Sequence, residues 1–414
     1  MLFPEGKTVI SSVPVNSADT AWMLTATALV LFMTPGLSFF YGGMVGHKNI
    51  ISTMLQSFVC MGIVSILWVI VGFSLCFGDS LGGIIGDPRT FFMFRNVTGA
   101  THADLSPTIP LILFALFQMK FAIITPALIT GSFAERVRFS SYTVFVSLFT
   151  IFIYAPLAHM TWHPEGLLRT AGVLDFAGGT VVHMSAGLSA LVGAWYLGRR
   201  QSHVSHELHR PANIPYVILG TGMLWFGWFG FNAGSALAAN ETAAFAFATT
   251  NTAGAAAMIT WMLMDSLKGN KPSALGACIG AVVGLVAITP AAGFVSVPHS
   301  IFIGAISSVI SFWAVNIKSR SELDDTLDVF PCHGVGGIAG MILTGVFVKE
   351  KGLIFGETEV FSTHLLALGG ITIFCVTMAA ILYWVTNKLA PLRVEKEHEI
   401  IGLDLSQHAE TILA

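Results

Sequence analysis

Two histidines stand in stretches of sequence that are otherwise strongly apolar. His183 lies in DFAGGTVVHMSAGLSALVGAWYL and His333 lies in DVFPCHGVGGIAGMILTGVF. An ionisable side chain is costly in hydrocarbon, so such residues usually face a polar pathway. A neutral imidazole has one donor and one acceptor nitrogen and titrates near physiological pH, so the two rings could pass hydrogen bonds or a proton along a pore. The alternative is two unconnected histidines in a core.

The residues that follow the two histidines repeat one pattern. Small side chains recur four, seven and eleven positions after each histidine, and these offsets share one face of a helix. The residues concerned are Gly187, Ala190 and Ala194 after His183, and Gly337, Gly340 and Thr344 after His333. The repetition predicts two related helices of an internal repeat, each with a face suited to close approach of backbones or to the passage of something small.

The composition of the whole chain is typical of a polytopic membrane protein. Of its 414 residues, 54% are hydrophobic and 10% are charged, whereas soluble domains are about a quarter charged. The formal net charge of −3 offers no electrostatic case for binding nucleic acid. The five cysteines lie in apolar segments without paired spacing, which indicates buried small residues rather than disulfides or a metal site.

Apolar runs of roughly 17–25 residues predict about eleven membrane spans. Their centres lie near residues 30, 64, 121, 150, 186, 224, 254, 284, 308, 340 and 375. The first run leads directly into TPGLSFFYGG without a short h-region and cleavage site, so no signal peptide is expected. With the N-terminus outside, about 13 basic residues fall in inner segments and about 6, Lys7 among them, in outer segments, which predicts an N-out, C-in orientation.

Six motifs extend along nearly the whole chain, from about Thr34 to Asp404. They are TPGLSFFYGGM, FQMKFAIITPALITGSFAERVRF, LDFAGGTVVH, GWFGFNAGSA, DVFPCHGVGGIAGMILTGVF and GLDLS. Together they resemble the ammonium transporter family, the relatives of the Rhesus glycoproteins. LDFAGGTVVH and GWFGFNAGSA are more similar to the microbial and plant transporters than to the Rhesus branch.

The resemblance implies an all-α polytopic membrane protein that assembles as a homotrimer in the cell membrane. Each subunit would have eleven transmembrane helices and a pore of its own between two inverted five-helix halves. The halves would cover roughly 19–200 and 213–350, with an outer eleventh helix at about 363–387. Residues 1–392 would form the membrane domain and residues 393–414 a cytoplasmic C-terminal tail.

The resemblance also implies roles for residues along the pore. His183 and His333 match paired pore histidines that handle protons, and Phe121 and Phe231 match stacked rings that gate the outer end. The remaining matches are an outer recruitment site at Trp162, Phe117 and Ser235, and supporting positions at Asp175, Trp228 and Thr289. An indole face could attract a cation with about 0.5–2 kcal/mol; the alternative for Trp162 is a tryptophan of the interfacial belt.

Two acidic residues precede the two histidines. Asp175 lies eight positions before His183, and Asp328 lies five positions before His333. Inverted halves would put one acid at the outer mouth and the other at the inner mouth. We expect Asp175 to cap its helix and to preorganise nearby backbone groups rather than to accept a proton directly. Lys120 departs from the family pattern beside Phe121, and its expected place is a neighbouring helix interface rather than the pore.

A narrow apolar pore suggests how ammonium would be handled. Stripping water from a unit charge is far more costly than desolvating neutral ammonia, so deprotonation near the entrance lowers the barrier. Potassium has no proton to release and would be rejected. We therefore expect passive ammonium transport, with methylammonium as a further substrate and net positive charge movement. The sequence has no nucleophile beside a base, phosphate-binding loop or metal cage, so we expect neither an enzyme nor a cofactor.

Two other functions remain as alternatives. An ammonium sensor would use the same fold and outer site, conduct poorly, and signal through the tail or through a fused domain. A coupled transporter for a larger amine or another cation would need a carboxylate-rich midplane site, for which the sequence offers no candidate. The resemblance also implies that the tail contacts a neighbouring subunit and supports docking of a PII-type signalling protein, whereas a frayed, solvated terminus is the alternative.

Overall fold

The computed structural model describes residues 13–205, 207 and 209–412. Lys7 and Ala414, which entered the predictions of orientation and of the tail, lie outside the described residues. In the described part of the chain almost every element is helical, and the single sheet is the two-stranded pair β1 (Ser80–Leu81) and β2 (Ile85–Gly86). An all-α membrane fold is therefore the observed class.

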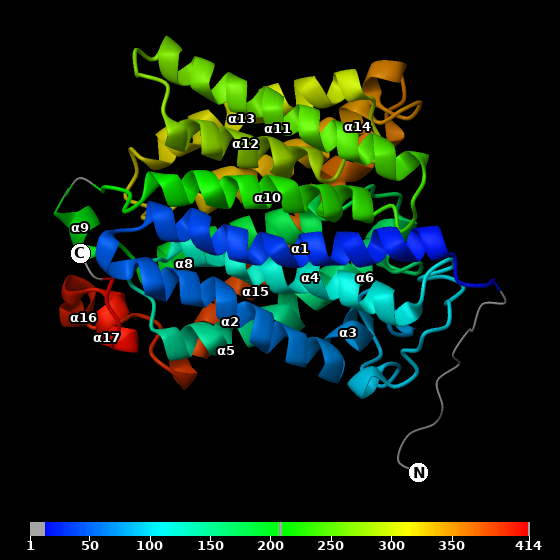
Figure 1. Cartoon of the computed structure of the whole chain (residues 1–414), viewed down its shortest axis with the longest axis horizontal. Helices are drawn as coiled ribbons and strands as arrows, with labels where there is room; N and C mark the ends of the chain where they lie inside the picture. The colour runs from blue at the N-terminus through cyan, green and yellow to red at the C-terminus, as the bar shows by residue number, and fades with distance from the viewer. Residues whose placement is uncertain (1–12, 206, 208, 413–414) are drawn as a thin grey trace.

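Long, nearly parallel helices make up the bundle (Figure 1). In the first part of the chain they are α1 (Ser17–Met44), α2 (Ile50–Leu67), α3 (Phe73–Phe77), α4 (Leu111–Ile129), α5 (Phe139–Phe149), α6 (Ala155–Trp162), α7 (Leu167–Thr170), α8 (Ser185–Leu197) and α9 (Gln201–Val204). In the second part they are α10 (Ile214–Gly234), α11 (Glu241–Leu267), α12 (Ala274–Ile288), α13 (Val297–Lys318), α14 (Gly336–Phe347), α15 (Glu359–Leu389), α16 (Lys396–Ile401) and α17 (Leu403–His408).

Helices α1 and α10 lie side by side across the middle of the bundle and join its two parts (Figure 1). Helices α2, α4, α5 and α8 pack on one side of this pair, and α11, α12 and α13 pack on the other. Helix α15 packs against α8, α5 and α14, so it contacts both parts.

Nine of the predicted span centres fall in helices of the described chain that are long and apolar enough to cross a bilayer. The centre near residue 254 falls in α11, which has 27 residues but is rich in alanine and threonine. The centre near residue 284 falls in α12, which has only 15 residues. The expectation of eleven long apolar spans is thus met only in part.

Short 3-10 and π turns interrupt or extend the helices. The 3-10 turns are η1 (His47–Asn49), η3 (Phe92–Phe94), η4 (Thr130–Ser132) and η8 (Leu353–Phe355). The π turns are η2 (Trp68–Gly72), η5 (Thr150–Tyr154), η6 (Gly179–Met184) and η7 (Phe330–Val335). A π turn inserts extra backbone into a helix and shifts the direction of the side chains that follow, and such turns often mark functional sites.

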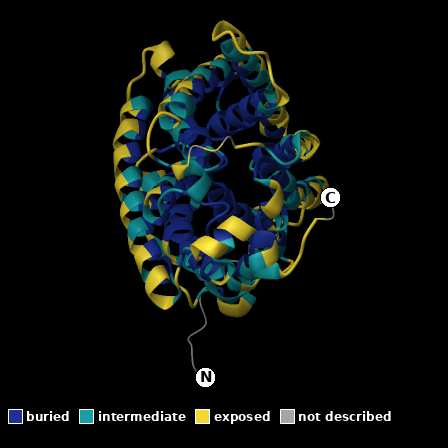
Figure 2. Ribbon diagram, turned by 90° about the vertical axis from the view of Figure 1, so that its left-hand side faces the viewer, coloured by how far each residue is buried: buried dark blue, intermediate teal, exposed yellow. Residues whose placement is uncertain are grey.

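Buried residues fill the middle of the bundle, and exposed residues lie around its rim (Figure 2). Many of the exposed side chains are large and apolar, among them Phe226, Ile259, Trp313, Leu366 and Ile373. Exposed apolar surface of this extent is stable when it faces lipid hydrocarbon. The chain is therefore a multi-pass membrane protein.

The described part of the C-terminal tail is folded against the bundle, next to the loops at one of its ends (Figure 1). Arg138 N donates to Leu392 O at 2.7 Å, and Val394 N donates to Arg136 O at 3.0 Å. Farther along, Ser52 N donates to the Asp404 carboxylate at 2.8 Å. A frayed terminus is thus wrong for residues 392–404. We call this end of the bundle the tail face, and the opposite end, where α1 begins, the vestibule face.

Candidate functional site: a pore through the helix bundle

His183 and His333 meet in the middle of the bundle. Their Nδ1 atoms are 3.3 Å apart, and the ring centroids are 5.4 Å apart. His183 lies in η6 and His333 lies in η7, so each ring projects from a π turn. Both imidazoles are almost completely buried.

Two glycines allow the turns that carry the histidines to approach this closely. A Cβ atom on Gly187 would lie 2.1 Å from Gly334 N, and one on Gly337 would lie 3.0 Å from Gly179 O. Any larger side chain at Gly187 would push α8 away from η7. The stripe of small residues therefore serves close backbone approach, the first of its two predicted uses.

Hydrogen bonds define the protonation pattern of the histidine pair. Thr289 Oγ1 donates to Leu285 O at 2.7 Å, so its lone pairs can accept from Trp228 Nε1 at 3.0 Å and from His183 Nε2 at 3.3 Å. A His183 ring that donates from Nε2 is an acceptor at Nδ1, which receives the Nδ1 proton of His333. This assignment leaves His333 Nε2 as an unprotonated acceptor.

An enclosed cavity of about 10 Å³ lies beside the two histidines. Apart from the imidazoles and the indole of Trp228, its walls are apolar. The lining residues are Met33, Leu37, Phe40, Ile124, Leu128, Val182, His183, Leu224, Trp228, Phe231, Val282 and His333. A space of this size holds about one water molecule, so any species that crosses it must shed nearly all of its hydration shell.

Phe121 and Phe231 separate this cavity from a larger one. The two rings are stacked, with centroids 4.1 Å apart and an interplanar angle of 27°. Phe231 lines the central cavity, whereas Phe121 lines the larger cavity toward the vestibule face. The stacked pair comes from α4 and α10, one helix from each part of the chain.

The larger cavity, which we call the vestibule, has a volume of about 560 Å³. Trp162 and Ser235 both line it. The Trp162 indole donates from Nε1 to Asp175 O at 3.1 Å and meets the Phe121 ring edge-on, with centroids 5.8 Å apart. Ser235 Oγ donates to Phe231 O at 2.8 Å, so its lone pairs remain available to a donor.

Phe117 was expected to line the recruitment site, but it does not reach the vestibule. Its side chain is fully buried and is not part of the vestibule lining. It packs edge-on behind Phe121, with ring centroids 4.9 Å apart, and it contacts the backbone near Gly234. Phe117 therefore supports Phe121 from behind, because the vestibule wall at this level is already formed by Phe121 and Gln118.

The Asp175 carboxylate caps the start of η6. It accepts from Gly178 N at 2.8 Å, Gly179 N at 2.7 Å and Thr180 N at 2.8 Å, and from Thr180 Oγ1 at 2.5 Å. Four donors around one carboxylate fix the backbone at the floor of the vestibule. Gly178, at φ +116°, makes the turn that brings these donors together.

This architecture coincides with that of known proteins. The sequence profile of the Ammonium Transporter Family matches residues 21–412. The chain belongs to this family. It is 44% identical over 407 residues to an ammonium transporter of Aquifex aeolicus, covering 97% of this chain and 94% of that one. It is 42% identical over 400 residues to an ammonium transporter of Bacillus subtilis, covering 95% and 97%.

Solved structures with the same fold also match this ammonium transporter family member. The crystal structure of Saccharomyces cerevisiae Mep2 superposes with a TM-score of 0.86 at 34% identity, covering 92% of this chain and 88% of that one. A structure described as a Sensor Amt Protein superposes with a TM-score of 0.87 at 28% identity, covering 94% and 98%.

The acid that caps the start of η7, as Asp175 caps the start of η6, is Asp325 and not Asp328. Asp325 accepts from Val329 N at 3.2 Å and from Phe330 N at 2.8 Å, at the start of η7. Asp328 instead pairs with Lys318 at 2.6 Å, at the end of α13. Asp325 lies eight positions before His333, the same offset as Asp175 from His183. That equal offset was the signal by which the sequence could have identified it.

Lys120 lines neither the vestibule nor the central cavity. Its side chain is half-buried on α4, and Nζ lies 3.7 Å from Met119 Sδ. The positive charge therefore lies beside the stacked phenylalanines in sequence but on another face of the helix.

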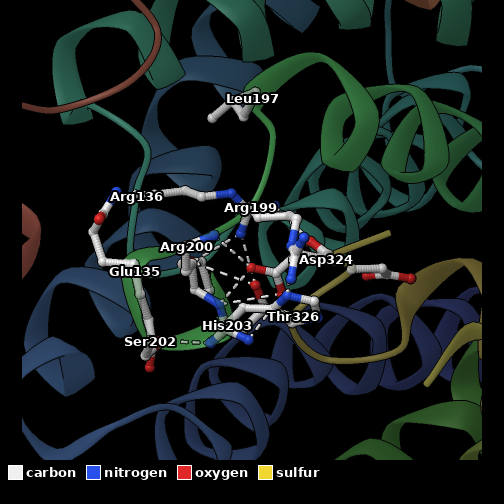
Figure 3. Close-up of polar contacts among 12 residues, drawn as sticks. Glu135, Arg136, Leu197, Arg199, Arg200, Ser202, His203, Asp324 and Thr326 are labelled. Atoms are coloured by element: carbon white, nitrogen blue, oxygen red, sulfur yellow. Dashed lines mark hydrogen bonds and ion pairs between the residues drawn. The ribbon is translucent and has the colours of Figure 1, made fainter. Parts of the chain in front are cut away.

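A buried ion-pair cluster lies at the tail face (Figure 3). Arg200 Nη1 pairs with Glu135 at 2.7 Å, and Arg200 Nε pairs with Asp324 at 2.9 Å. Burial alone would raise the pKa of the Asp324 carboxyl, but hydrogen bonds and charge from Arg200 outweigh it and hold that pKa well below its usual range. In the adjacent residue, burial raises the pKa of Asp325 to about 6. The cluster joins the loop before α5, the loop after α8 and the loop before η7.

Proposed function

We propose that this protein conducts ammonium across the membrane through the pore described above. The observation that carries the proposal is the order of its parts: a wide vestibule, two stacked phenylalanines, and a small apolar cavity bounded by two hydrogen-bonded histidines. This order suits a substrate that arrives as a hydrated cation and continues as a smaller, neutral species. The names of the relatives support the same substrate.

In this proposal Trp162 attracts the cation by its ring face, and Ser235 accepts one of the substrate N–H bonds. Asp175 keeps the vestibule floor preorganised. Rotation of Phe121 and Phe231 opens the way to the histidines, and Phe117 limits that rotation from behind.

The histidine pair then gives the dehydrated substrate its polar contacts. Ammonia has N–H donors, and His333 Nε2, which the hydrogen bonds of the pair leave as an acceptor, can accept one of them. Ammonium releases one proton before ammonia enters the central cavity, and the His183–His333 hydrogen bond carries that proton onward when the two rings exchange donor and acceptor roles, so net positive charge moves. Potassium is excluded because a pore with space for about one water molecule cannot replace its hydration shell.

We further propose that the vestibule face is outside the cell and the tail face is cytoplasmic. Arginines 136, 199, 200 and 393 gather at the tail face, in agreement with the positive-inside rule. The functional unit is a homotrimer of subunits with eleven transmembrane helices, in which halves at 19–200 and 213–350 flank each pore. Methylammonium is a further substrate, and a PII-type protein is a partner at the tail face.

The deciding experiment is the current produced when ammonium is added to proteoliposomes that contain the purified protein. We expect a saturable, inward positive current with ammonium, a smaller one with methylammonium and none with potassium. Empty liposomes are the control. A robust ammonium flux without any current would contradict charge movement, and the absence of both flux and current would contradict conduction.

An ammonium sensor is the second candidate, and the match to the Sensor Amt Protein favours it. A sensor would bind ammonium in the same vestibule and transmit occupancy to the tail while conducting poorly. Binding followed by intrinsic tryptophan fluorescence, measured in parallel with the current, separates the two. Saturable binding without current would favour the sensor.

A further inference from the structure

Three charged side chains line the vestibule: Asp104, Arg169 and Asp175. The Asp175 carboxylate is already occupied by four hydrogen bonds within the chain. Asp104 and Arg169 are both exposed. The charge that an incoming cation meets at this mouth therefore depends mainly on one carboxylate and one guanidinium.

Arg169 is fixed close to the proposed recruitment residue. It projects from the short helix α7, and its Nη1 atom donates to Trp162 O at 2.9 Å. The guanidinium charge is thus held at the backbone of the residue whose indole would attract the substrate. A positive charge here is unexpected in a protein that takes up a cation, because it opposes the attraction from the ring face.

Asp104 offers the opposite charge in the lining of the same mouth. Its backbone N lies 3.3 Å from His102 Nδ1, in the turn closed by the bridge between His102 and Ser106. Within the described residues its carboxylate has no ion pair or hydrogen bond, and Arg169 is not within ion-pair distance of it. The two charges are therefore not cancelled by direct contact.

We propose that Arg169 and Asp104 are the specificity-determining residues that set the affinity of the vestibule for a charged substrate, Arg169 by lowering it and Asp104 by raising it. The inference rests on the proposed function and extends it to the charge of the recognised species. The charges of the two residues would not change the binding of a neutral amine, whereas both would change the binding of ammonium. Walls of low dielectric constant strengthen such effects inside a concave mouth.

The expected effect is moderate. Two unit charges about 8 Å apart, at an effective dielectric constant of about 30–80, change a binding constant by roughly two- to tenfold. Ionic strength near 1 M shortens the Debye length to about 3 Å and should remove most of the difference.

The test measures the half-saturating ammonium concentration for the current in proteoliposomes, at low and at high ionic strength. Arg169→Gln should lower it about two- to tenfold, Arg169→Glu should lower it further, and Asp104→Asn should raise it. Arg169→Lys keeps the charge and should stay close to wild type. Each shift should shrink at high ionic strength.

Arg89→Gln is the matched control. Arg89 is also an exposed arginine near the vestibule face, but it pairs with Asp87 at 2.6 Å and does not line the vestibule. This variant should leave the half-saturating concentration unchanged. An equal shift in Arg89→Gln and Arg169→Gln would overturn the inference, because the effect would then belong to the whole surface.

Two other outcomes would also overturn the inference. Equal half-saturating ammonium concentrations in Arg169→Lys and Arg169→Gln would mean that the contact with the Trp162 carbonyl matters and the charge does not. Salt-independent shifts would exclude an electrostatic origin. If wild type carried no current, the proposed conduction would be contradicted, but the inference about Arg169 and Asp104 would not. The order of the half-saturating ammonium concentrations of the variants would then be measured by ammonium-induced changes in tryptophan fluorescence.

Discussion

Asp175 and Asp325 occupy equivalent positions toward the two ends of the helix bundle. Each carboxylate accepts backbone N–H groups at the start of a π turn, and each lies eight positions before the histidine of that turn. Asp175 lines the vestibule, whereas Asp325 lies at the tail face beside Asp324. The two acids are therefore the anchors of η6 and η7, and they set where His183 and His333 meet.

Replacing His183 or His333 by leucine should slow ammonium transport by at least about tenfold, because the polar line through the apolar cavity is broken. The protein should still fold, since leucine fills a similar volume. Ammonium current in proteoliposomes measures the effect. His299→Leu removes a histidine from α13, away from the pore, and is the control. Wild-type flux in both pore variants would mean that the pair is structural.

Trp162→Ala should raise the half-saturating ammonium concentration by roughly two- to thirtyfold, since about 0.5–2 kcal/mol of cation attraction is removed. Trp162→Phe keeps a ring face but loses the hydrogen bond to Asp175 O, so its half-saturating concentration should lie between those of wild type and Trp162→Ala. Concentration dependence of the current is the measurement. A normal response of the alanine variant at low ammonium would show that recruitment happens elsewhere.

Phe231→Ala should alter the maximal current more than the half-saturating concentration, because the stacked ring lies between the vestibule and the central cavity. Phe229→Ala is a matched control on the same helix. Phe229 stacks on Phe247 with centroids 3.9 Å apart and does not line the central cavity. If both alanine variants changed the maximal current equally, the effect would reflect loss of packing in α10 rather than loss of a gate.

Asp325 should make the stability of the protein depend on pH between about 4 and 6. Its pKa of about 6 lies above the unfolded value of about 3.9, so its contribution is present below pH about 4 and is lost as pH rises through 6. The full contribution is at most about 3 kcal/mol. Thermal unfolding from pH 4 to 7 should show this trend in wild type but not in Asp325→Asn. Parallel profiles for the two proteins would contradict it.

Ending the chain after Pro391 should leave the membrane assembly intact but change the flux or its regulation by a PII-type protein. The deletion removes the Arg393 guanidinium, which donates to Leu197 O and Arg199 O at 2.7 Å, next to the buried Arg200 cluster. Ending the chain after Glu410 keeps these contacts and is the control. Ammonium current and PII pull-down are the two measurements, and unchanged values in both would leave the tail without a regulatory role.

Local sequence was sufficient to predict most of the long apolar helices and to single out the two histidines. Long apolar runs form helices in a bilayer because the backbone must satisfy its own hydrogen bonds there. The two histidines could be identified for a related reason, because a titratable residue in such a run needs a polar environment. The α12 helix was recognised in position but overestimated in length, since apolar composition does not show where a helix ends.

Tertiary packing decided which side chains face the cavities and where the tail docks. The side-chain directions after η6 and η7 depend on π turns, which shift the helical phase and have no simple sequence signal. The prediction paired Asp328 with Asp175, whereas Asp325 makes the capping bonds and has the same eight-residue offset to its histidine. Phe117 and Phe121 are one turn apart on α4, and only the contacts of α4 with α1 and α10 decide which ring faces the vestibule. The docked tail depends on hydrogen bonds between segments more than 250 residues apart, which local pattern cannot reveal.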